Sequence, residues 1–358
     1  MERETAETDL AGSPAPRKRL SGKKKLLYGS LGVFLAIALI AAYYAYSIYS
    51  FADRIYQPPA DPPPSASLPL DGSEPTPIAS IEPPDRFGDE RINILLLGGD
   101  SRGTSSKAKP RSDTIIVVSI DPVSMSAHLF SLLRDTYVEI PRYGPNRLNA
   151  AITLGGPQLA METVRNLIDQ PIHHYVYTDF EGFISLIDEL GGIELDIEKR
   201  MRHIDKRDDP RYNIDLEKGL QKLDGLTALQ YVRFRGDAMS DFSRSERQRN
   251  FLSAVAAKLK STTTLFKLPQ LLNGIAPYIE TSIPPGELFE LARLGLKLDT
   301  GRLTGIQIPQ TNAFRNERIR GMDVLVPDLD KVRQHVEETL EGEKAGGAPP
   351  YAQAAQSD

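Results

Sequence analysis

Residues 26–52 contain no charged side chain, and this stretch constrains the fold of the chain more than any other. It reads LLYGSLGVFLAIALIAAYYAYSIYSFA, longer than the ~20 residues with which a helix crosses a hydrocarbon core of about 30 Å. Tyrosines gather at its far end, where amphipathic rings prefer the membrane interface. A cleaved signal peptide would have an apolar region of only about 7–15 residues, ending at small residues. We therefore predict a transmembrane anchor over 26–52.

The residues before this run predict its orientation. The segment 17–25 reads RKRLSGKKK and carries six positive charges. Clusters of Lys and Arg stay in the cytoplasm when a helix inserts, and such a flank also disfavours a buried core helix. We predict a cytoplasmic basic stub over 1–25 and a single-pass protein of the cell membrane, with everything after Asp53 extracellular.

Proline dominates the next segment, because residues 57–85 hold ten prolines among Ser, Ala, Asp and Glu. This composition is typical of an extended, semi-rigid spacer. We predict a linker over 53–87 that holds the following domain off the membrane surface. The far end of the chain is small and polar from about Glu341, and we predict a disordered tail over 336–358. One folded unit, 88–335, lies between them.

Composition excludes several functions for this unit. The chain of 358 residues has 43 Lys and Arg against 48 Asp and Glu, whereas a nucleic-acid binder needs a surplus of positive charge. It has no cysteine, which excludes disulfides, thiolate zinc sites and a cysteine nucleophile. Its five histidines do not show the H-x-x-x-H spacing of zinc proteases. We expect no nucleic-acid partner.

Uninterrupted apolar runs of strand length begin the folded unit. Strands that do not alternate between apolar and polar residues are buried on both faces, which requires helices on both sides of the sheet. The runs lie at 92–97, 114–120 and 127–133, short strands at 175–177 and 193–197, and helical patterns at 157–168, 180–190, 226–234, 244–259, 264–273 and 286–298. The mixture predicts an α/β fold with three layers, α/β/α, in which a central mixed sheet is covered by helices on both faces.

Polar motifs flank the predicted strands. GGDSR, at 98–102, directly follows the first strand, where glycines let a ligand approach the backbone and where open α/β sheets bind ligands. RSDT, at 111–114, leads into the second strand. Asp100 and Asp113 would suit Mg²⁺, which seldom has an all-protein cage and takes waters and phosphate oxygens as well. Taken alone, each motif is better explained as a surface or capped turn, and Arg134-Asp135 after the third strand as a local salt bridge.

A cluster of arginines follows the helix at 226–234. The chain reads YVRFR at 231–235 and DFSRSERQ at 241–248. Arg244 and Gln248 are four residues apart and share a helix face, with Arg247 close by. Arginine is favoured for bidentate recognition of phosphate, so the cluster can bind a polyanion. A solvated, salt-bridged helix explains the same residues.

These motifs together resemble the LytR–CpsA–Psr family of cell-envelope proteins. The resemblance covers residues 92 to about 260 and the membrane anchor, and it rests on the order of GGDSR, RSDT, LRDT (133–136), GG (155–156), the arginines of 231–235 and DFSRSERQ. One departure is Leu133, where the family often has proline before Arg-Asp. The resemblance implies a membrane-anchored phosphotransferase that moves an anionic glycopolymer from a polyprenyl-pyrophosphate carrier to peptidoglycan. The polymer is a wall teichoic acid, or a capsular or secondary wall polysaccharide.

The resemblance also implies roles for single residues. Asp100 and Asp113 match magnesium ligands, with Mn²⁺ as the other candidate ion. Residues that match the pyrophosphate-binding positions are Arg102, Arg134, Arg233, Arg235, Arg244 and Gln248, and Asp241 and Arg247 match positions lining the same pocket. We expect Arg134 and Arg233 to clamp the transition state, since phosphoryl transfer mainly needs positioning and neutralisation of spread negative charge. Asp135 or Asp241 would accept the proton of the attacking sugar hydroxyl.

Two other functions remain open at this point. The same residues suit a polyprenyl-pyrophosphate phosphatase or pyrophosphatase with water as the nucleophile. A non-catalytic envelope regulator is the third hypothesis, since family members have been called transcriptional attenuators. The lipid would need an apolar tunnel, which the apolar residues between 115 and 195 could line, although the same residues serve equally as core.

Overall fold

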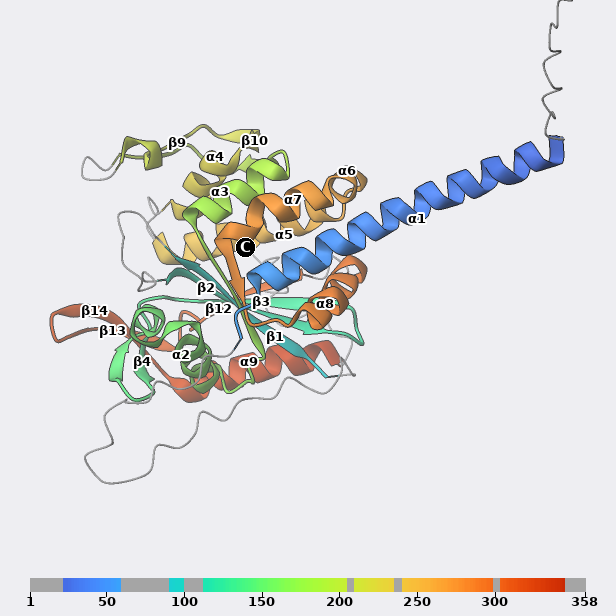
Figure 1. Ribbon diagram of the computed structural model, residues 1–358. Coiled ribbons are helices and arrows are strands. Elements are labelled where there is room, and N and C mark those ends of the chain that lie inside the picture. Colours follow the sequence, from blue (N-terminus) through green and yellow to red (C-terminus); the bar gives the residue numbers. More distant parts are fainter. Residues whose placement is uncertain are drawn as a thin grey trace, which may run out of the picture. The chain divides into compact units, whose positions relative to one another are not determined.

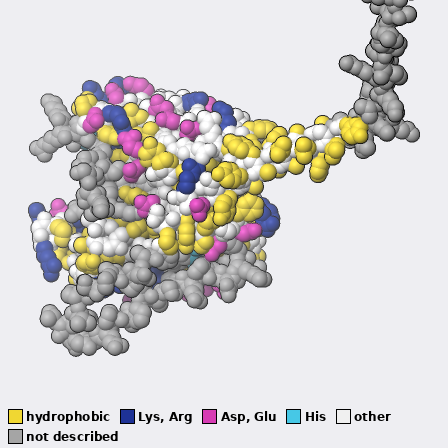
Figure 2. Space-filling view, in the orientation of Figure 1, with side chains coloured by type: hydrophobic (Ala, Val, Ile, Leu, Met, Phe, Trp, Pro, Cys, Tyr) yellow, Lys and Arg dark blue, Asp and Glu magenta, His cyan; other side chains and the backbone are white. Residues whose placement is uncertain are grey.

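The computed structural model describes residues 22–58, 90–99, 112–204, 209–234, 240–298 and 303–344, and two compact units divide the chain between Tyr46 and Ser47. The first unit holds the start of helix α1 (Gly22–Ile55). Figure 2 shows hydrophobic side chains along nearly its whole exposed length. From Ser30 onward its mean hydropathy reaches 2.0, so by length and composition this helix can cross a membrane.

A six-stranded mixed sheet forms the centre of the second unit (Figure 1). The middle strands run antiparallel, β1 beside β2 and β2 beside β3, whereas β6 pairs parallel to β1 and β12 parallel to β3. In spatial order the strands are β11 (Ile279–Thr281), β6 (His174–Asp179), β1 (Ile92–Gly99), β2 (Ser112–Asp121), β3 (Ser126–Leu132) and β12 (Leu303–Ile308). The mixed sheet that the sequence predicts is confirmed.

Helices cover both faces of this sheet because its strands are apolar on both sides. In β2, Ile115 and Val117 enter one apolar cluster, and Val118 and Ile120 enter another on the opposite face. The helices are α2 (Ala151–Ile168) and α9 (Leu329–Lys344) on the first face, and α3 (Phe180–Glu189), α4 (Gly225–Arg233), α5 (Ser240–Leu259), α6 (Thr262–Phe266), α7 (Leu268–Ile275) and α8 (Pro285–Lys297) on the second (Figure 1). The three-layer α/β/α prediction is therefore correct.

Small two-stranded sheets and single turns of 3₁₀ helix complete the unit. The two-stranded antiparallel sheets are β4 (Tyr137–Ile140) with β5 (Gly144–Arg147), β7 (Ile193–Ile197) with β10 (Gly219–Leu223), β8 (Met201–His203) with β9 (Ile214–Leu216), and β13 (Phe314–Ile319) with β14 (Met322–Pro327). The 3₁₀ turns are η1 (Leu148–Ala150), η2 (Pro210–Tyr212) and η3 (Ala276–Tyr278). The predicted helix 264–273 is instead two helices, α6 and α7. Pro269, which has no backbone N–H, occupies the first turn of the second.

The predicted linker 53–87 is wrong at its start. Phe51 and Ile55 are buried in the apolar cluster beneath α3 and α7, and the backbone N–H of Gln57 donates to the Thr281 carbonyl at 2.8 Å. The chain therefore enters the folded unit before the prolines, most of which lie outside the described residues. It returns to the same unit at β1, so the segment between these points does not connect α1 to the folded unit.

The predicted tail over 336–358 is also wrong at its start. Helix α9 continues to Lys344, and Val336 and Leu340 are buried against the sheet together with Val332. These residues recur every four positions, which forms the apolar stripe of an amphipathic helix. The residues from 345 onward lie outside the described part of the chain.

Candidate functional site

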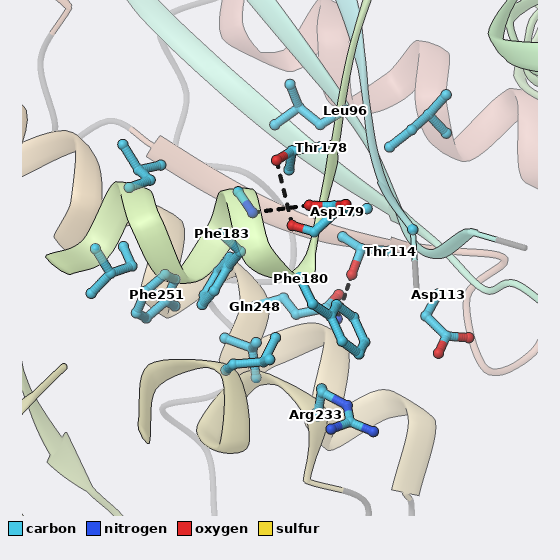
Figure 3. A pocket seen from close by; sticks show the side chains of 18 of the residues that line it. Leu96, Asp113, Thr114, Thr178, Asp179, Phe180, Phe183, Arg233, Gln248 and Phe251 are labelled. Carbon is cyan, nitrogen blue, oxygen red and sulfur yellow. Dashed lines mark hydrogen bonds between the residues drawn. The ribbon is translucent and has the colours of Figure 1, made fainter. Parts of the chain in front are cut away.

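A cavity of about 520 Å³ lies where β1 and β6 end, beneath α3, α4 and α5 (Figure 3). Gly98 and Gly99 of β1 and Asp179 of β6 line it, and Gly99 and Asp179 are partners in the parallel register. A side chain on Gly99 would collide with the Tyr177 hydroxyl, so only glycine fits beside that ring. The cavity therefore occupies the crevice beyond strand ends, where the GGDSR motif predicts a ligand.

The two ends of the cavity differ in chemistry. One end is apolar, and the close-up view places Phe183 of α3 and Phe251 of α5 there (Figure 3). Leu186, Leu252 and Val255 extend the same lining. The other end is polar, and Asp113, Arg134, Arg233 and Gln248 line it. A cavity of this kind suits an amphiphile with an anionic head and an apolar tail.

Arg134 occupies the centre of a charged network at the polar end. It follows β3, and its guanidinium donates through Nη1 to the Asp113 carboxylate and through Nε to the Asp135 Oδ2 at 3.3 Å. Arg147, from β5, donates through Nη1 to the other Asp135 oxygen at 3.1 Å. The side chains of the two arginines are only 22% and 23% exposed, so each guanidinium is held rather than mobile.

Asp135 has a different role from the one that the sequence predicts. Both of its carboxylate oxygens accept from arginines, and its main-chain carbonyl accepts from the Leu325 N–H at 3.1 Å. It is not among the described residues that line the cavity. The proton acceptor hypothesis for Asp135 is therefore not supported, and its contacts make it a positioning residue for Arg134 and Arg147.

Aromatic rings position Arg233, the last residue of α4. Its guanidinium carbon lies 4.8 Å from the centre of the Phe180 ring and 5.6 Å from that of the Tyr212 ring. Contacts of this kind attract a cation to the face of an aromatic ring and hold the guanidinium in place. Burial, followed by the nearby Glu181 carboxylate, raises the pKa of Tyr212, so this ring stays neutral at physiological pH.

Gln248 and Arg247 point in different directions from α5. Gln248 lines the cavity and donates to the Thr114 hydroxyl at 3.2 Å (Figure 3). Arg247 is 3% exposed and donates to the Glu198 carboxylate at 3.1 Å and to the Phe234 carbonyl at 2.6 Å. The predicted place of Arg247 in the pocket is therefore wrong: its guanidinium joins α5 to the end of α4 and to the chain after β7.

Several predicted site residues lie outside the described part of the chain. They are Asp100, Arg102 and Arg235, together with Asp241 and Arg244, whose backbone belongs to α5 but whose side chains are not described. Conversely, Asp179 lines the cavity without having been predicted. Its carboxylate accepts from the Gly182 N–H at 2.9 Å and caps α3. A strand ending in Asp at the same sheet edge as the Gly-Gly turn is the sequence signal that could have indicated it.

Oxygen ligands for a metal ion are present but few among the described residues. The Asp113 and Asp179 carboxylates both line the cavity, and no group of three His, Asp or Glu side chains within the described ranges is close enough to hold an ion. Mg²⁺ bound to a phosphorylated ligand commonly takes only one or two carboxylates. The described residues therefore form no preformed all-protein metal site, and a magnesium ion in this cavity would need phosphate oxygens among its ligands.

The fold and the site together define a class of protein: a three-layer α/β domain with a cavity that is apolar at one end and lined by arginine and aspartate at the other. The model of the LytR_cpsA_psr family matches residues 70–341. The chain therefore belongs to this family, as its motifs predict.

Some relatives are named as transferases and others as regulatory proteins. The polyisoprenyl-teichoic acid–peptidoglycan teichoic acid transferase TagU of Bacillus cereus is 30% identical over 277 residues, 76% of this chain and 83% of that protein. The regulatory protein MsrR of Staphylococcus aureus is 34% identical over 205 residues, 56% of this chain. The match spans only 59% of the length of MsrR.

A solved structure gives the ligand class of one relative. The LytR-CPS2A-psr family protein YwtF (TagT), with bound octaprenyl pyrophosphate lipid, aligns with 74% of this chain and 95% of its own at a TM-score of 0.55 and 25% identity. That ligand is an amphiphile with a pyrophosphate head, which is the chemistry that the two ends of the cavity suit.

Proposed function

We propose that this protein is a membrane-anchored phosphotransferase that moves an anionic glycopolymer from a polyprenyl-pyrophosphate carrier to peptidoglycan. The observation that carries the proposal is that one cavity has both an apolar end and a polar end, the latter lined by Arg134, Arg233, Gln248 and Asp113. The name of TagU and the lipid bound to TagT support the same substrate class. We further propose that α1 anchors the protein in the cell membrane with the domain outside.

The carrier lipid would bind with its chain at the apolar end of the cavity and its pyrophosphate at the polar end. Phe183, Phe251 and the neighbouring aliphatic side chains would receive the first isoprene units, because burying apolar surface contributes about 25 cal/mol per Å². Arg134 and Arg233 would bind the two phosphates, since guanidinium groups match phosphate oxygens bidentately. The head group would then lie beside Gly98 and Gly99 at the end of β1, where the backbone can approach it closely.

The proposed reaction is an attack by a peptidoglycan sugar hydroxyl on the phosphorus that carries the polymer. A new P–O bond to the sugar forms, the P–O bond to the bridging oxygen breaks, and polyprenyl phosphate leaves. Arg134 and Arg233 would stabilise the charge that spreads over the transferring and leaving phosphates. Asp241 is the remaining candidate to accept the hydroxyl proton, because Asp135 is held by Arg134 and Arg147.

A magnesium ion, or manganese, would be held by Asp113 together with Asp100 and the substrate phosphates. It would neutralise part of the negative charge of the pyrophosphate. Asp113 also contacts Arg134, so the same carboxylate would set the positions of both the ion and the guanidinium.

Product analysis tests the proposal. The full chain in proteoliposomes is incubated with Mg²⁺, a polyprenyl-pyrophosphate-linked oligosaccharide and peptidoglycan fragments, and the products are identified by mass spectrometry. A glycan joined to peptidoglycan through a phosphodiester, with polyprenyl phosphate released, is the expected result. Polyprenyl phosphate with free phosphorylated glycan would favour the hydrolase. Bound but unchanged lipid would favour the regulator, the role that the name of MsrR indicates.

A matched pair of arginine variants links the reaction to the cavity. Arg233→Gln should lower the rate at least 100-fold, as loss of one preorganised transition-state donor costs about 10²–10³ in rate. Arg142→Gln is the control, because Arg142 pairs with Glu162 at 3.0 Å on the surface and does not line the cavity. Equal rates for the two variants would refute the role of Arg233.

A further inference from the structure

The chain passes from the anchor helix into the folded unit at Ser47, beside α7 and β11. Ser47 and Phe51 are 6% and 7% exposed, and the Arg54 guanidinium donates to the Asn273 side chain of α7 at 2.6 Å. Tyr56 then forms a parallel bridge with Thr281 of β11. The last two turns of α1 are thus part of the domain, and α7 and β11 are the elements that hold them.

The length of the uncharged run leaves no spacer between the bilayer and this point. Residues 26–46 precede the folded unit, and at a rise of about 1.5 Å per residue they span about 31 Å as a helix. A hydrocarbon core is about 30 Å thick. If α1 is the anchor proposed above, the whole available helix is needed to cross the bilayer, and α7, β11 and their neighbours must lie at the level of the lipid head groups.

Those neighbours expose large apolar side chains. Twelve large hydrophobic residues of the described part of the second unit, apart from α1, are exposed, and half of them fall between residues 259 and 296. Phe266 of α6 is 81% exposed and Phe289 of α8 is 53% exposed. The other four are Leu259, Leu265, Tyr278 and Leu296. Apolar groups concentrated in this way mark an interaction surface rather than scattered exposure.

Basic side chains accompany the apolar ones. Lys267 and Lys297 are exposed, and the Lys260 ammonium donates to the Leu298 carbonyl, so the start of α6 and the end of α8 lie together. Of the two acidic groups of α8, Glu290 forms an ion pair with Arg293 at 3.5 Å, and Glu287 contacts the Nε2 of the buried His174 at 2.9 Å. Aromatic and aliphatic side chains beside lysines are the composition of a surface that lies in the interface of an anionic bilayer.

We propose that this surface, which we call the collar (Leu265, Phe266, Lys267, Phe289, Leu296 and Lys297), rests on the bilayer around the end of the anchor and contacts anionic lipid. The collar adds a second, interfacial attachment to the transmembrane one. It also places the cavity at the membrane, because Ile279, which lines the cavity, belongs to the same short strand as Thr281. A carrier lipid would then reach the apolar end of the cavity without its chain crossing water.

The absence of cysteine from the sequence allows a direct test. Phe266→Cys and Phe289→Cys each carry a single environment-sensitive fluorophore, in the full chain reconstituted into vesicles of phosphatidylcholine and phosphatidylglycerol. Leu220→Cys and Tyr143→Cys are matched controls, since these residues are 76% and 51% exposed and lie outside the collar. Tyr143 lies in the turn between β4 and β5, on the opposite face of the sheet from α8. All four positions are on the surface, so the substitutions leave the core unchanged, and circular dichroism checks the fold.

The readout is quenching by lipids that carry a nitroxide near the head group. We expect a blue-shifted emission and strong quenching at positions 266 and 289, and neither at 220 and 143. Equal quenching at all four positions, or no quenching at the collar, would overturn the proposal. The second result is also the one expected if another protein covers the collar. Flotation of the unlabelled chain with the vesicles reports on the anchor separately, and no step depends on transferase activity.

Discussion

The burial of the end of α1 predicts that a helix expected to serve the membrane also stabilises the domain. Phe51 and Ile55 are 7% and 2% exposed and belong to the same apolar cluster as residues of α3, α5 and α7. Truncating a buried Phe to Ala costs about 3–5 kcal/mol, from lost transfer free energy and the cavity left behind. Since alanine favours a helix slightly over phenylalanine, we expect Phe51→Ala to lower the free energy of unfolding by about 3 kcal/mol.

The measurement uses residues 47–358, which form one compact unit. Thermal unfolding is followed by circular dichroism, where about 3 kcal/mol corresponds to a fall in Tm of about 6–12 °C. Tyr49→Ala is the control, because Tyr49 lies two residues away on the same helix but is 65% exposed, and we expect a change within about 0.5 kcal/mol. If Phe51→Ala were no more destabilising than Tyr49→Ala, the end of α1 would not belong to the core, and the short connection to the membrane would be refuted as well.

Three further outcomes follow from the contacts of the site and the core. Asp135→Asn should reduce the transfer rate about tenfold or more while the KM for the lipid changes less, because the variant misplaces Arg134 without removing it; steady-state kinetics measure this split. Phe180→Leu removes the nearer ring from Arg233 and should weaken lipid pyrophosphate binding by about 0.5–1 kcal/mol, which titration calorimetry detects. Burial, followed by the charge of His173, lowers the pKa of His174 to about 4. Because the unfolded chain binds that proton near pH 6.5, His174 should cost about 3 kcal/mol of stability as the pH falls from about 6.5 to 4. Burial raises the pKa of Glu287, so protonation of this carboxyl group stabilises the folded state as the pH falls and opposes the loss from His174. In a urea-unfolding series, His174→Gln should show a flatter pH dependence of stability.

The central strands were predictable because their signal is local. β1, β2 and β3 are apolar on both faces, and a run of such residues indicates a buried strand wherever it occurs. β12 was missed, because LTGIQI is short, alternates and contains glycine. It becomes a strand only through parallel pairing with β3, whose residues lie more than 170 positions earlier in the chain. Pairing between strands this far apart in the chain leaves no periodic pattern in the sequence of either strand.

The residues of the site likewise include some that the sequence indicates locally and others that only the fold brings together. Asp113, Arg134, Arg233 and Gln248 belong to short motifs, and the resemblance indicated all of them. The residues that position them were not predictable: Arg147 reaches Asp135 through a hairpin, and Tyr212 reaches Arg233 from a 3₁₀ turn. Arg247 was misassigned for a related reason. Neighbouring residues of a helix point about 100° apart, and only the packing of α5 decides which of the two faces the cavity.

The docking of α1 has a consequence for how an enzyme can use a substrate that stays in the membrane. An extended, proline-rich spacer over 53–87 would reach about 110 Å at about 3.1 Å per residue, several bilayer cores away from the lipid. The carrier chain would then have to leave the bilayer and expose apolar surface to water before it reached the cavity. Burial of Phe51 and Ile55 removes that distance, because the end of the anchor and the strand that carries Ile279 are held by the same contacts, Tyr56 with Thr281. The contacts that stabilise the domain are therefore also those that would keep its cavity at the height of its substrate.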